Sequence, residues 1–240
     1  MILSVHQPQY IPWLGYFDKI LKSDCFVVLD QVQYKAREYQ NRNRIRTNHG
    51  WMWLTVPVKS SGQGRQKISR IKIDNSTGWR KKHSDSLRTW YKKAESFHDH
   101  FPFFEDVFTR DWDDLQDLNI HIMRYMLEKL GIHRTVYFES DLDITATKTE
   151  RIIDICRKLN ADVYLSGSGG RDYLEENKFT RAGIKLEYQN FSHPRYRQQH
   201  MAGGDGFMPY MSCIDLLFNE GRKSSDILRG ERGNQVWYIR

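Results

Sequence analysis

The chain has 240 residues, of which 39% are hydrophobic, enough to bury the core of one domain with insertions. Its longest apolar runs are about five or six residues, far short of the ~20 that a membrane-spanning helix needs, so no membrane span is expected. The formal net charge of +7 suits a polyanionic or phosphorylated partner without saying which.

The N-terminus has no basic region followed by a long apolar stretch, so no signal peptide is predicted. The three cysteines, Cys25, Cys156 and Cys213, form no Cys-x-x-Cys pair. We therefore expect a cytoplasmic protein in which no cysteine binds a metal or acts as a nucleophile.

The N-terminal segment predicts a strand, a helix and a second strand. Residues 1–5 form a short apolar run, residues 14–22 carry apolar side chains at helical spacing, and residues 25–30 are a continuous apolar run ending in Asp30. Such a βαβ unit has a right-handed crossover.

The middle of the chain, 47–130, is expected to be an insertion. Residues 51–58 and 68–74 are strand-like and are joined by a basic, glycine-containing loop, which predicts a β-hairpin with a mobile loop. Residues 79–130 have a helical pattern, with breaks at Pro102 and in an acidic stretch around 110–119.

The remaining residues return to alternating strands and helices. Thr147 and Glu150 have the spacing of a capping box at the start of a helix. The predicted elements are strand 135–141, helix 147–160, strands 162–167 and 183–191, and helix 212–221.

The sequence thus predicts an α/β fold. We expect a Rossmann-like, mostly parallel sheet with helices on both faces, together with a β-hairpin and a helical insertion. Residues 1–230 are expected to form a single domain, and residues 231–240 a C-terminal tail.

Ligands of open α/β sheets bind outside the carboxyl ends of the strands. Three polar segments, 6–15, 30–46 and 166–174, follow predicted strands. We expect a ligand to touch both the first and the third of them.

The first segment contains two candidate catalytic residues, His6 and Gln7. His6 suits a general base, or a donor to a phosphate or carbonyl oxygen, with a pKa close to the ~6.5 of a free histidine. Alternatively, His6 fixes the turns at Pro8 and Pro12 through backbone hydrogen bonds. Gln7 is a candidate amide donor beside it.

The same segment carries three candidate binding residues. Tyr10 and Trp13 either pack in the core or form platforms on which a ligand stacks. Gly15 is the third, and its role is implied by a resemblance described below.

The third segment, SGSGGRDYL, suits an anion. Gly167, Gly169 and Gly170 let the backbone approach an anion closely, and Arg171 adds a charge; an ordinary strand-to-helix turn is the alternative. Neither a Gly-Lys-Ser/Thr phosphate loop nor a Gly-x-Ser-x-Gly nucleophile elbow is present.

Two other basic stretches supply candidate ligand contacts. Arg42 and Arg44 lie on one side of the extended segment NRNRIR, either as a pair that binds a phosphate or as part of a solvated edge strand. His193 and Tyr196 belong to a mixed aromatic and basic loop, and Pro194 excludes a central strand there.

No metal site is expected. His98 and His100 are two residues apart in a helical context, where side chains at that spacing diverge.

Several segments, taken in order, resemble the WbqC-like proteins of bacterial polysaccharide gene clusters. They are HQPQYIPWLGYFDKI, SDCFVVLDQVQY with NRNRI, WLTVPV, YLSGSGGRDYL and MPYMSCIDLLFNEG. The resemblance implies a role in the biosynthesis of O-antigen, the surface polysaccharide of lipopolysaccharide, and for some members a glycine or aminoacyl transferase activity.

A weaker resemblance is to the adenylyl-transfer fold, which carries a His-x-Gly-His turn after its first strand. The matching letters here are WLGY, so Trp13 and Tyr16 replace both histidines while Gly15 is kept. What this resemblance implies is the geometry alone, a glycine turn that opens a helix against a phosphate.

Residues and resemblance together favour a transferase. It moves an aminoacyl group, such as glycyl, or another small acyl group onto the amino group of a nucleotide-linked amino-sugar. His6 is the expected base, Gln7 and the 167–170 backbone form the oxyanion side, and the phosphate ligands are Arg42, Arg44 and Arg171.

No tightly bound cofactor is expected. The acyl donor is a thioester on an acyl carrier protein, an aminoacyl-tRNA, or an adenylate made from ATP. The alternatives are a non-catalytic protein that binds a nucleotide-sugar or nucleic acid, and a degenerate nucleotidyltransferase-like enzyme.

Overall fold

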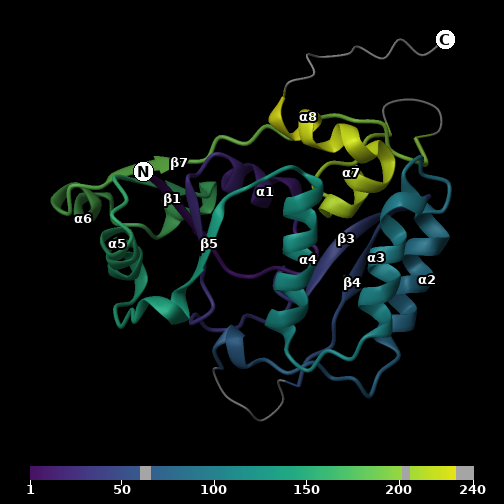
Figure 1. The fold of residues 1–240 in the computed structure, drawn as a ribbon, viewed down its shortest axis with the longest axis horizontal. Helices are drawn as coiled ribbons and strands as arrows, with labels where there is room; N and C mark the ends of the chain where they lie inside the picture. The colour runs from purple at the N-terminus through teal and green to yellow at the C-terminus, as the bar shows by residue number, and fades with distance from the viewer. Residues whose placement is uncertain (60–65, 202–205, 231–240) are drawn as a thin grey trace.

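The computed structural model describes residues 1–59, 66–201 and 206–230 (Figure 1). The expected tail, 231–240, and most of the glycine-containing loop expected after residue 58 lie outside the described residues.

The described chain forms strands, α-helices and short 3₁₀ turns. The strands are β1 (Ile2–His6), β2 (Cys25–Val28), β3 (Arg42–Thr47), β4 (Gly50–Thr55), β5 (Thr135–Phe138), β6 (Val163–Ser166) and β7 (Lys185–Tyr188). The α-helices are α1 (Leu14–Leu21), α2 (Trp79–Tyr91), α3 (Phe97–Thr109), α4 (Leu115–Lys129), α5 (Lys148–Lys158), α6 (Glu176–Arg181), α7 (Cys213–Glu220) and α8 (Ser224–Arg229). The 3₁₀ turns are η1 (Ile68–Arg70), η2 (Glu139–Leu142), η3 (Ser168–Asp172) and η4 (Gly221–Lys223).

Five parallel strands form the main sheet, in the order β5-β2-β1-β6-β7. The chain winds outward from β1 through β2 to β5, and then crosses to β6 and β7 on the other side of β1. The winding direction therefore reverses between β1 and β6, which is the switch point where open α/β sheets bind ligands. The predicted α/β fold with a mostly parallel sheet is confirmed.

Helices cover both faces of this sheet, as predicted. Successive residues of β2 point to opposite faces: Phe26 packs in the cluster that contains Phe17 of α1, whereas Val27 packs in the cluster that contains Ile153 of α5. The continuous apolar run at 25–28 reflects this burial on both sides.

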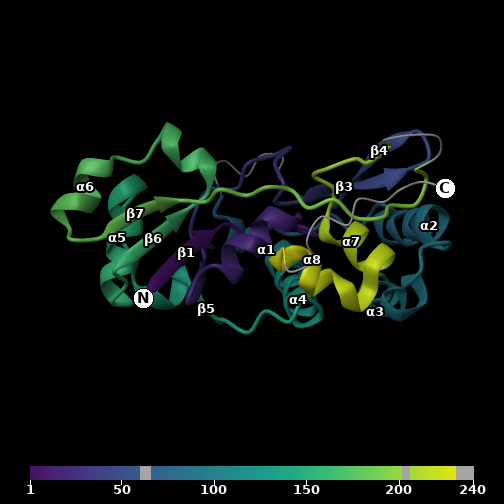
Figure 2. The same cartoon turned by 90° about the horizontal axis from the view of Figure 1, so that it is seen from above.

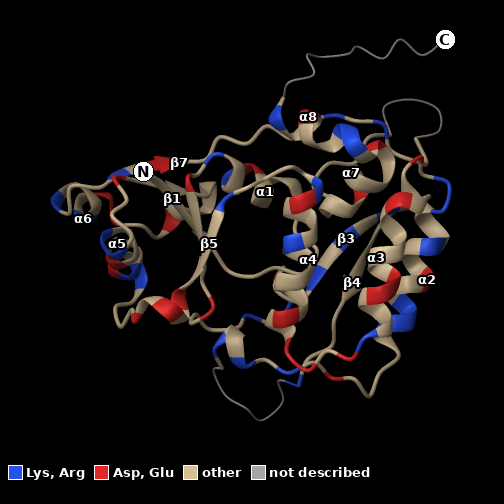
Figure 3. Cartoon of the chain, in the orientation of Figure 1, with Lys and Arg blue, Asp and Glu red and all other residues tan. Residues whose placement is uncertain are grey.

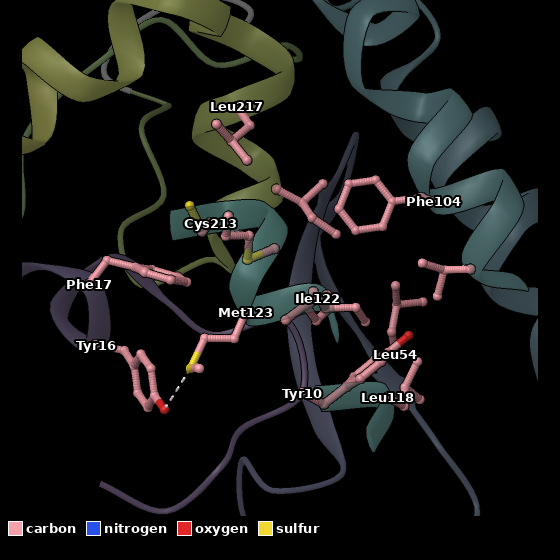
Figure 4. Close-up of a cluster of buried hydrophobic side chains, with 14 of the residues drawn as sticks. Tyr10, Tyr16, Phe17, Leu54, Phe104, Leu118, Ile122, Met123, Cys213 and Leu217 are labelled. Carbon is pink, nitrogen blue, oxygen red and sulfur yellow. Dashed lines mark hydrogen bonds between the residues drawn. The ribbon is translucent and has the colours of Figure 1, made fainter. Parts of the chain in front are cut away.

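The insertion is packed into the first of these clusters. Figure 4 shows Tyr10, Leu54 and Phe104, which come from the segment after β1, from β4 and from α3, around the same core. In the same view the Tyr16 hydroxyl of α1 donates to the Met123 sulfur of α4 at 3.5 Å. The core is thus continuous from the sheet to the hairpin.

The parallel sheet with α5 and α6 lies at one end of the long axis of the molecule, and β3 and β4 with α2 and α3 lie at the other (Figures 1 and 2). Helices α1 and α4 lie between these two ends.

The expected pairing of 51–58 with 68–74 is wrong. The strand β4 pairs instead with β3, along a full antiparallel ladder closed by a tight turn at 48–49. Gly50 ends that turn with φ at +137°, a conformation that L side chains rarely adopt. Residues 68–70 form η1, and Val58 forms only an isolated bridge with Ile73.

Two smaller expectations about helix ends also differ from the structure. Pro102 lies inside α3 and does not end it, although a proline at this sixth position cannot donate a bond to the carbonyl of His98. Thr147 makes no side-chain capping bond, and Glu150 pairs with Lys178 at 3.3 Å instead.

In the described ranges, no helix has the length and apolar character needed to cross a bilayer.

Candidate functional site

The candidate site is at the switch point, where the carboxyl ends of β1 and β6 lie side by side. His6 ends β1, Ser166 ends β6, and Gln189 follows β7 directly. The backbone N–H of Gln189 donates to the Ser166 carbonyl at 2.7 Å.

A buried lysine from α1 lies at this edge. Lys19 is only 3% exposed, and its Nζ donates to the Val5 carbonyl of β1 at 2.9 Å. A Cβ added to Gly167, just after β6, would lie 3.9 Å from the same Nζ. The amine of Lys19 therefore lies between the ends of the two strands that flank the switch point.

No carboxylate of the described chain forms an ion pair with Lys19, and burial lowers its pKa to about 7. The neighbouring Asp18 is engaged elsewhere, because it pairs with Lys22 at 2.9 Å and accepts from Gln189 at 2.6 Å. Lys19 is thus either an unneutralised buried cation or a neutral amine close to physiological pH, and both forms are suited to chemistry with a substrate.

His6 is held beside this lysine. Its Nδ1 lies 3.1 Å from the Gln7 carbonyl, so Nδ1 carries the proton and Nε2 is left as the acceptor. Burial and the charge of Lys19 lower the pKa of His6 to about 3, against a weaker opposing effect of the Gln7 bond. The expectation of an ordinary histidine pKa is wrong, and His6 is neutral at neutral pH.

Gln7 is oriented by a second amide. Its Oε1 accepts from Gln40 at 2.5 Å, and the Gln40 Oε1 in turn accepts from the Lys35 backbone N–H at 2.9 Å. Since the carbonyl end of the Gln7 side chain is engaged, its NH₂ group is the end that can donate to a substrate oxygen.

The aromatic residues of the 6–15 segment pack against the protein. A Cβ on Gly15 would lie 2.1 Å from the Trp13 ring, so the indole occupies the space that was expected to admit a phosphate. Tyr10 is fully buried, and its hydroxyl lies 2.8 Å from Nδ1 of His83. Neither Gly15 nor Tyr10 presents a surface to a ligand.

The glycines after β6 have distinct local roles. The Gly170 N–H donates to the Gly167 carbonyl at 2.9 Å, so one of the expected oxyanion donors is already used. A Cβ on Gly170 would lie 2.1 Å from the Ser166 hydroxyl, whereas nothing lies within 4 Å of one on Gly169. The backbone near Gly167 is the part of this loop that faces Lys19.

The three expected phosphate arginines do not converge. Arg171 stacks on the Tyr188 ring at 4.0 Å, at the end of β7. Arg42 and Arg44 extend from β3 of the hairpin over the Trp53 ring, at 4.2 and 5.9 Å.

His193 and Tyr196 lie on the segment that leads from β7 to α7. The Nδ1 of His193 is 2.8 Å from the Pro194 carbonyl, and burial lowers the pKa of the ring. The buried Tyr196 hydroxyl donates to Asp215 of α7 at 2.8 Å, so Tyr196 is part of an internal network.

Buried carboxylates follow the other two strands of this edge. Asp30, after β2, accepts from the Ser140 N–H at 2.9 Å. Glu139, after β5, pairs with Arg151 at 3.2 Å, and burial raises the pKa of its carboxyl group. No group of three or more His, Cys, Asp or Glu side chains in the described ranges could hold a metal ion.

Sequence reasoning missed Lys19 and Gln189. Lys19 follows Gly15 by one helical turn, and seven of the eight residues of α1 are buried. A lysine inside so short and apolar a helix, between two buried strands, was the available signal. Nothing in the sequence marked Gln189, because its partners come from α1, about 170 residues earlier.

Comparison with known proteins confirms the family resemblance. The model of the WbqC-like protein family matches residues 7–227. The chain is also 35% identical over 228 residues to a Mycobacterium tuberculosis (strain ATCC 25618 / H37Rv) protein named "Uncharacterized protein Rv1507c"; the match covers 95% of this chain and 97% of that protein. No solved structure matches the chain. The chain belongs to the WbqC-like protein family.

Proposed function

We propose that this protein is a transferase that moves an aminoacyl or small acyl group onto the amino group of a nucleotide-linked amino-sugar in surface-polysaccharide synthesis. The observation that carries the proposal is the buried Lys19 amine between the ends of β1 and β6. An anion such as the diphosphate of a nucleotide-sugar would neutralise that charge, which no carboxylate of the described residues balances.

The transfer step itself also needs a base. The sugar nitrogen attacks the acyl carbonyl carbon, a C–N bond forms, and the bond to the leaving group breaks. The nitrogen must lose a proton, and Lys19 cannot take it while it is paired with the diphosphate, because a bound anion raises the pKa of the amine and keeps it protonated.

His6 is not suited to act as the base either. With a pKa of about 3, His6 is a weak proton acceptor, and its Nε2 is better suited to accept a hydrogen bond from the substrate. The NH₂ group of Gln7 is aimed by Gln40 and is the candidate donor to the developing oxyanion.

Adenylyl transfer is disfavoured by the observed packing. Trp13 and Tyr16 stand where that fold has its histidines; Trp13 covers Gly15, and Tyr16 is only 1% exposed. The turn that would bind triphosphate is thus filled with aromatic rings.

The proposal is tested by titrating a UDP-linked amino-sugar into the wild-type protein and Lys19→Met. Loss of a charge-assisted bond to the diphosphate should weaken binding by roughly tenfold or more. Transfer is then measured with each donor in turn: a carrier thioester, an aminoacyl-tRNA, and an amino acid with ATP.

Two glycine variants provide a matched pair. Gly167→Ala adds a methyl group 3.9 Å from the lysine amine and should weaken binding, whereas Gly169→Ala meets nothing within 4 Å and should not. Binding without transfer from any donor would favour the non-catalytic alternative. If the wild-type protein and Lys19→Met bind the nucleotide-sugar with equal affinity, the ligand does not bind at the switch point.

A further inference from the structure

One face of the β3–β4 hairpin alternates arginine and tryptophan. The antiparallel register places Arg44 opposite Trp53 and Arg46 opposite Trp51, with Arg42 at the next position along the same face. We call these five side chains the arginine–tryptophan ladder.

The side chains of the ladder are stacked on one another. The Arg42 guanidinium lies 4.2 Å from the centre of the Trp53 ring, and Arg44 lies 5.2 Å from that of Trp51. The two indoles meet edge to face at 5.5 Å. Rings and guanidinium groups are therefore arranged before any ligand arrives.

The opposite face of the hairpin belongs to the core, because Ile45 and Leu54 have no exposed surface. Figure 2 shows α2 and α3 on one side of the hairpin, while the segment that joins β7 to α7 passes alongside it. Trp51 remains 44% exposed, a large fraction for a tryptophan.

The three arginines of the ladder differ in their surroundings, because Arg46 is only 6% exposed and donates to the Gly206 carbonyl at 2.9 Å. Within the described chain, Arg42 and Arg44 form no ion pair; their side chains donate to the backbone carbonyls of Arg37 and Tyr210. Figure 3 shows the basic residues along β3. Alternate residues of a strand are about 6.6 Å apart, so the guanidinium groups of Arg42 and Arg44 present two neighbouring charges to an anionic chain.

The aromatic surface continues toward the switch point. Tyr210 is 51% exposed, and its ring centre lies 5.8 Å from that of Trp13, which covers Gly15 at the start of α1. The same Tyr210 contributes the carbonyl that accepts from Arg44. Exposed rings thus extend from the ladder to α1.

We propose that the arginine–tryptophan ladder binds single-stranded nucleic acid. The guanidinium groups of Arg42 and Arg44 contact successive phosphates, and the exposed indole of Trp51 stacks on a base. A duplex would present its phosphates but not its base faces, so the exposed ring selects the single strand. This inference goes beyond the proposed transferase activity and does not depend on it.

The test measures the binding of fluorescein-labelled oligouridine and oligothymidine of about twelve nucleotides by fluorescence anisotropy, at several salt concentrations. Trp51→Ala should weaken binding about fivefold or more through the lost stacking. Arg44→Gln should reduce the slope of log affinity against log salt by about 0.7, as expected for one lost phosphate contact. The two oligonucleotides distinguish RNA from DNA.

Each ladder variant has a control variant that makes the same kind of change in another part of the protein. Arg88 also lies over an aromatic ring, that of Phe101 at 4.7 Å, and Arg88→Gln removes the same charge from α2. Tyr137→Ala removes an exposed ring from β5. Both controls should bind like the wild-type protein, and the melting temperature of every variant shows that it is folded.

Three results would overturn the inference. The first is no binding of either oligonucleotide by the wild-type protein, and the second is equal losses in the ladder and control variants. The third is equal affinity for inorganic polyphosphate, which has no bases, together with no effect of Trp51→Ala; that would indicate a surface for polyanions in general. None of these results bears on transfer from a carrier thioester or from an amino acid with ATP, which involve no nucleic acid.

Discussion

A lysine amine enclosed at the end of a central strand is costly unless something compensates its charge. Lys19 has a carbonyl partner and, in the described chain, no carboxylate partner, and its pKa is correspondingly lowered to about 7. In the absence of an anion, the folded protein is destabilised by protonation of this one group.

This coupling gives the sign of a pH dependence. Between pH 7 and 10.5 the unfolded chain keeps the Lys19 proton while the folded chain has lost it, so the free energy of unfolding rises with pH across that window. The contribution is at most about 1.4 kcal/mol per pH unit. Urea unfolding of wild type and Lys19→Met at about pH 7.5 and about pH 9 measures it.

The wild-type protein should gain stability over Lys19→Met as the pH rises. Other groups that titrate in this range, the cysteine thiols among them, are shared by both proteins and cancel in the difference. A difference that stays constant with pH would mean that Lys19 titrates normally.

Only some residues of the candidate site could be predicted from the sequence. It identified the two strand-end segments and His6, because strands followed by polar residues are visible in one dimension. It did not reveal which arginines face the switch point, since Arg42, Arg44 and Arg171 each stack on a ring supplied by another segment. Such pairings depend on register and topology rather than on local pattern.

At the scale of elements, α1 begins with a contact between Gly15 and the indole of Trp13. A Cβ at Gly15 would lie 2.1 Å from that ring, so Gly15→Ala should destabilise the protein by about 1–3 kcal/mol through overpacking. In a Trp13→Ala background the clash is gone, and alanine favours a helix over glycine by about 1 kcal/mol.

A double-mutant cycle in urea therefore checks this contact. The effect of Gly15→Ala should change sign when Trp13 is absent. If Gly15→Ala is equally destabilising in both backgrounds, the contact with the Trp13 ring is not the cause of the lost stability.

The predictions of strands and helices likewise succeeded where a local pattern decides the structure and failed where a distant partner decides it. Residues 25–30 were recognised as a strand because a parallel strand buried on both faces is apolar throughout. Residues 42–47 were not paired correctly, because one face of β3 carries arginines whose β-structure is stabilised by the tryptophans across the ladder. The next apolar run along the chain looked like the better partner.

At the scale of the whole molecule, one buried carboxylate joins distant segments. Asp215 of α7 accepts from Tyr91 of α2 at 2.8 Å, and from Tyr196 and Gln198 of the preceding segment at 2.8 and 2.6 Å. Tyr91 also accepts from the backbone N–H of Arg46 on β3 at 2.8 Å. The hairpin, the helical insertion and the C-terminal helices are thereby held together.

The cysteines can test whether the molecule opens as one unit, as the single domain expected for residues 1–230 requires. Cys156 lies in the cluster on one face of the sheet and Cys213 in the cluster on the other; both are fully buried. Burial raises the pKa of both thiols, so neither reacts with an alkylating reagent until the structure opens.

Two proteins with one cysteine each, Cys25→Ala with Cys213→Ala and Cys25→Ala with Cys156→Ala, allow the two faces to be followed separately. Alkylation is measured by mass spectrometry at increasing urea concentration. If the sheet and the insertion unfold together, each thiol should react with a urea dependence equal to that of global unfolding of the same variant. The core that is continuous from the sheet to the hairpin contains Cys213 but not Cys156. If Cys156 reacts at urea concentrations well below the global transition while Cys213 stays protected, the sheet face covered by α5 opens independently of the hairpin end.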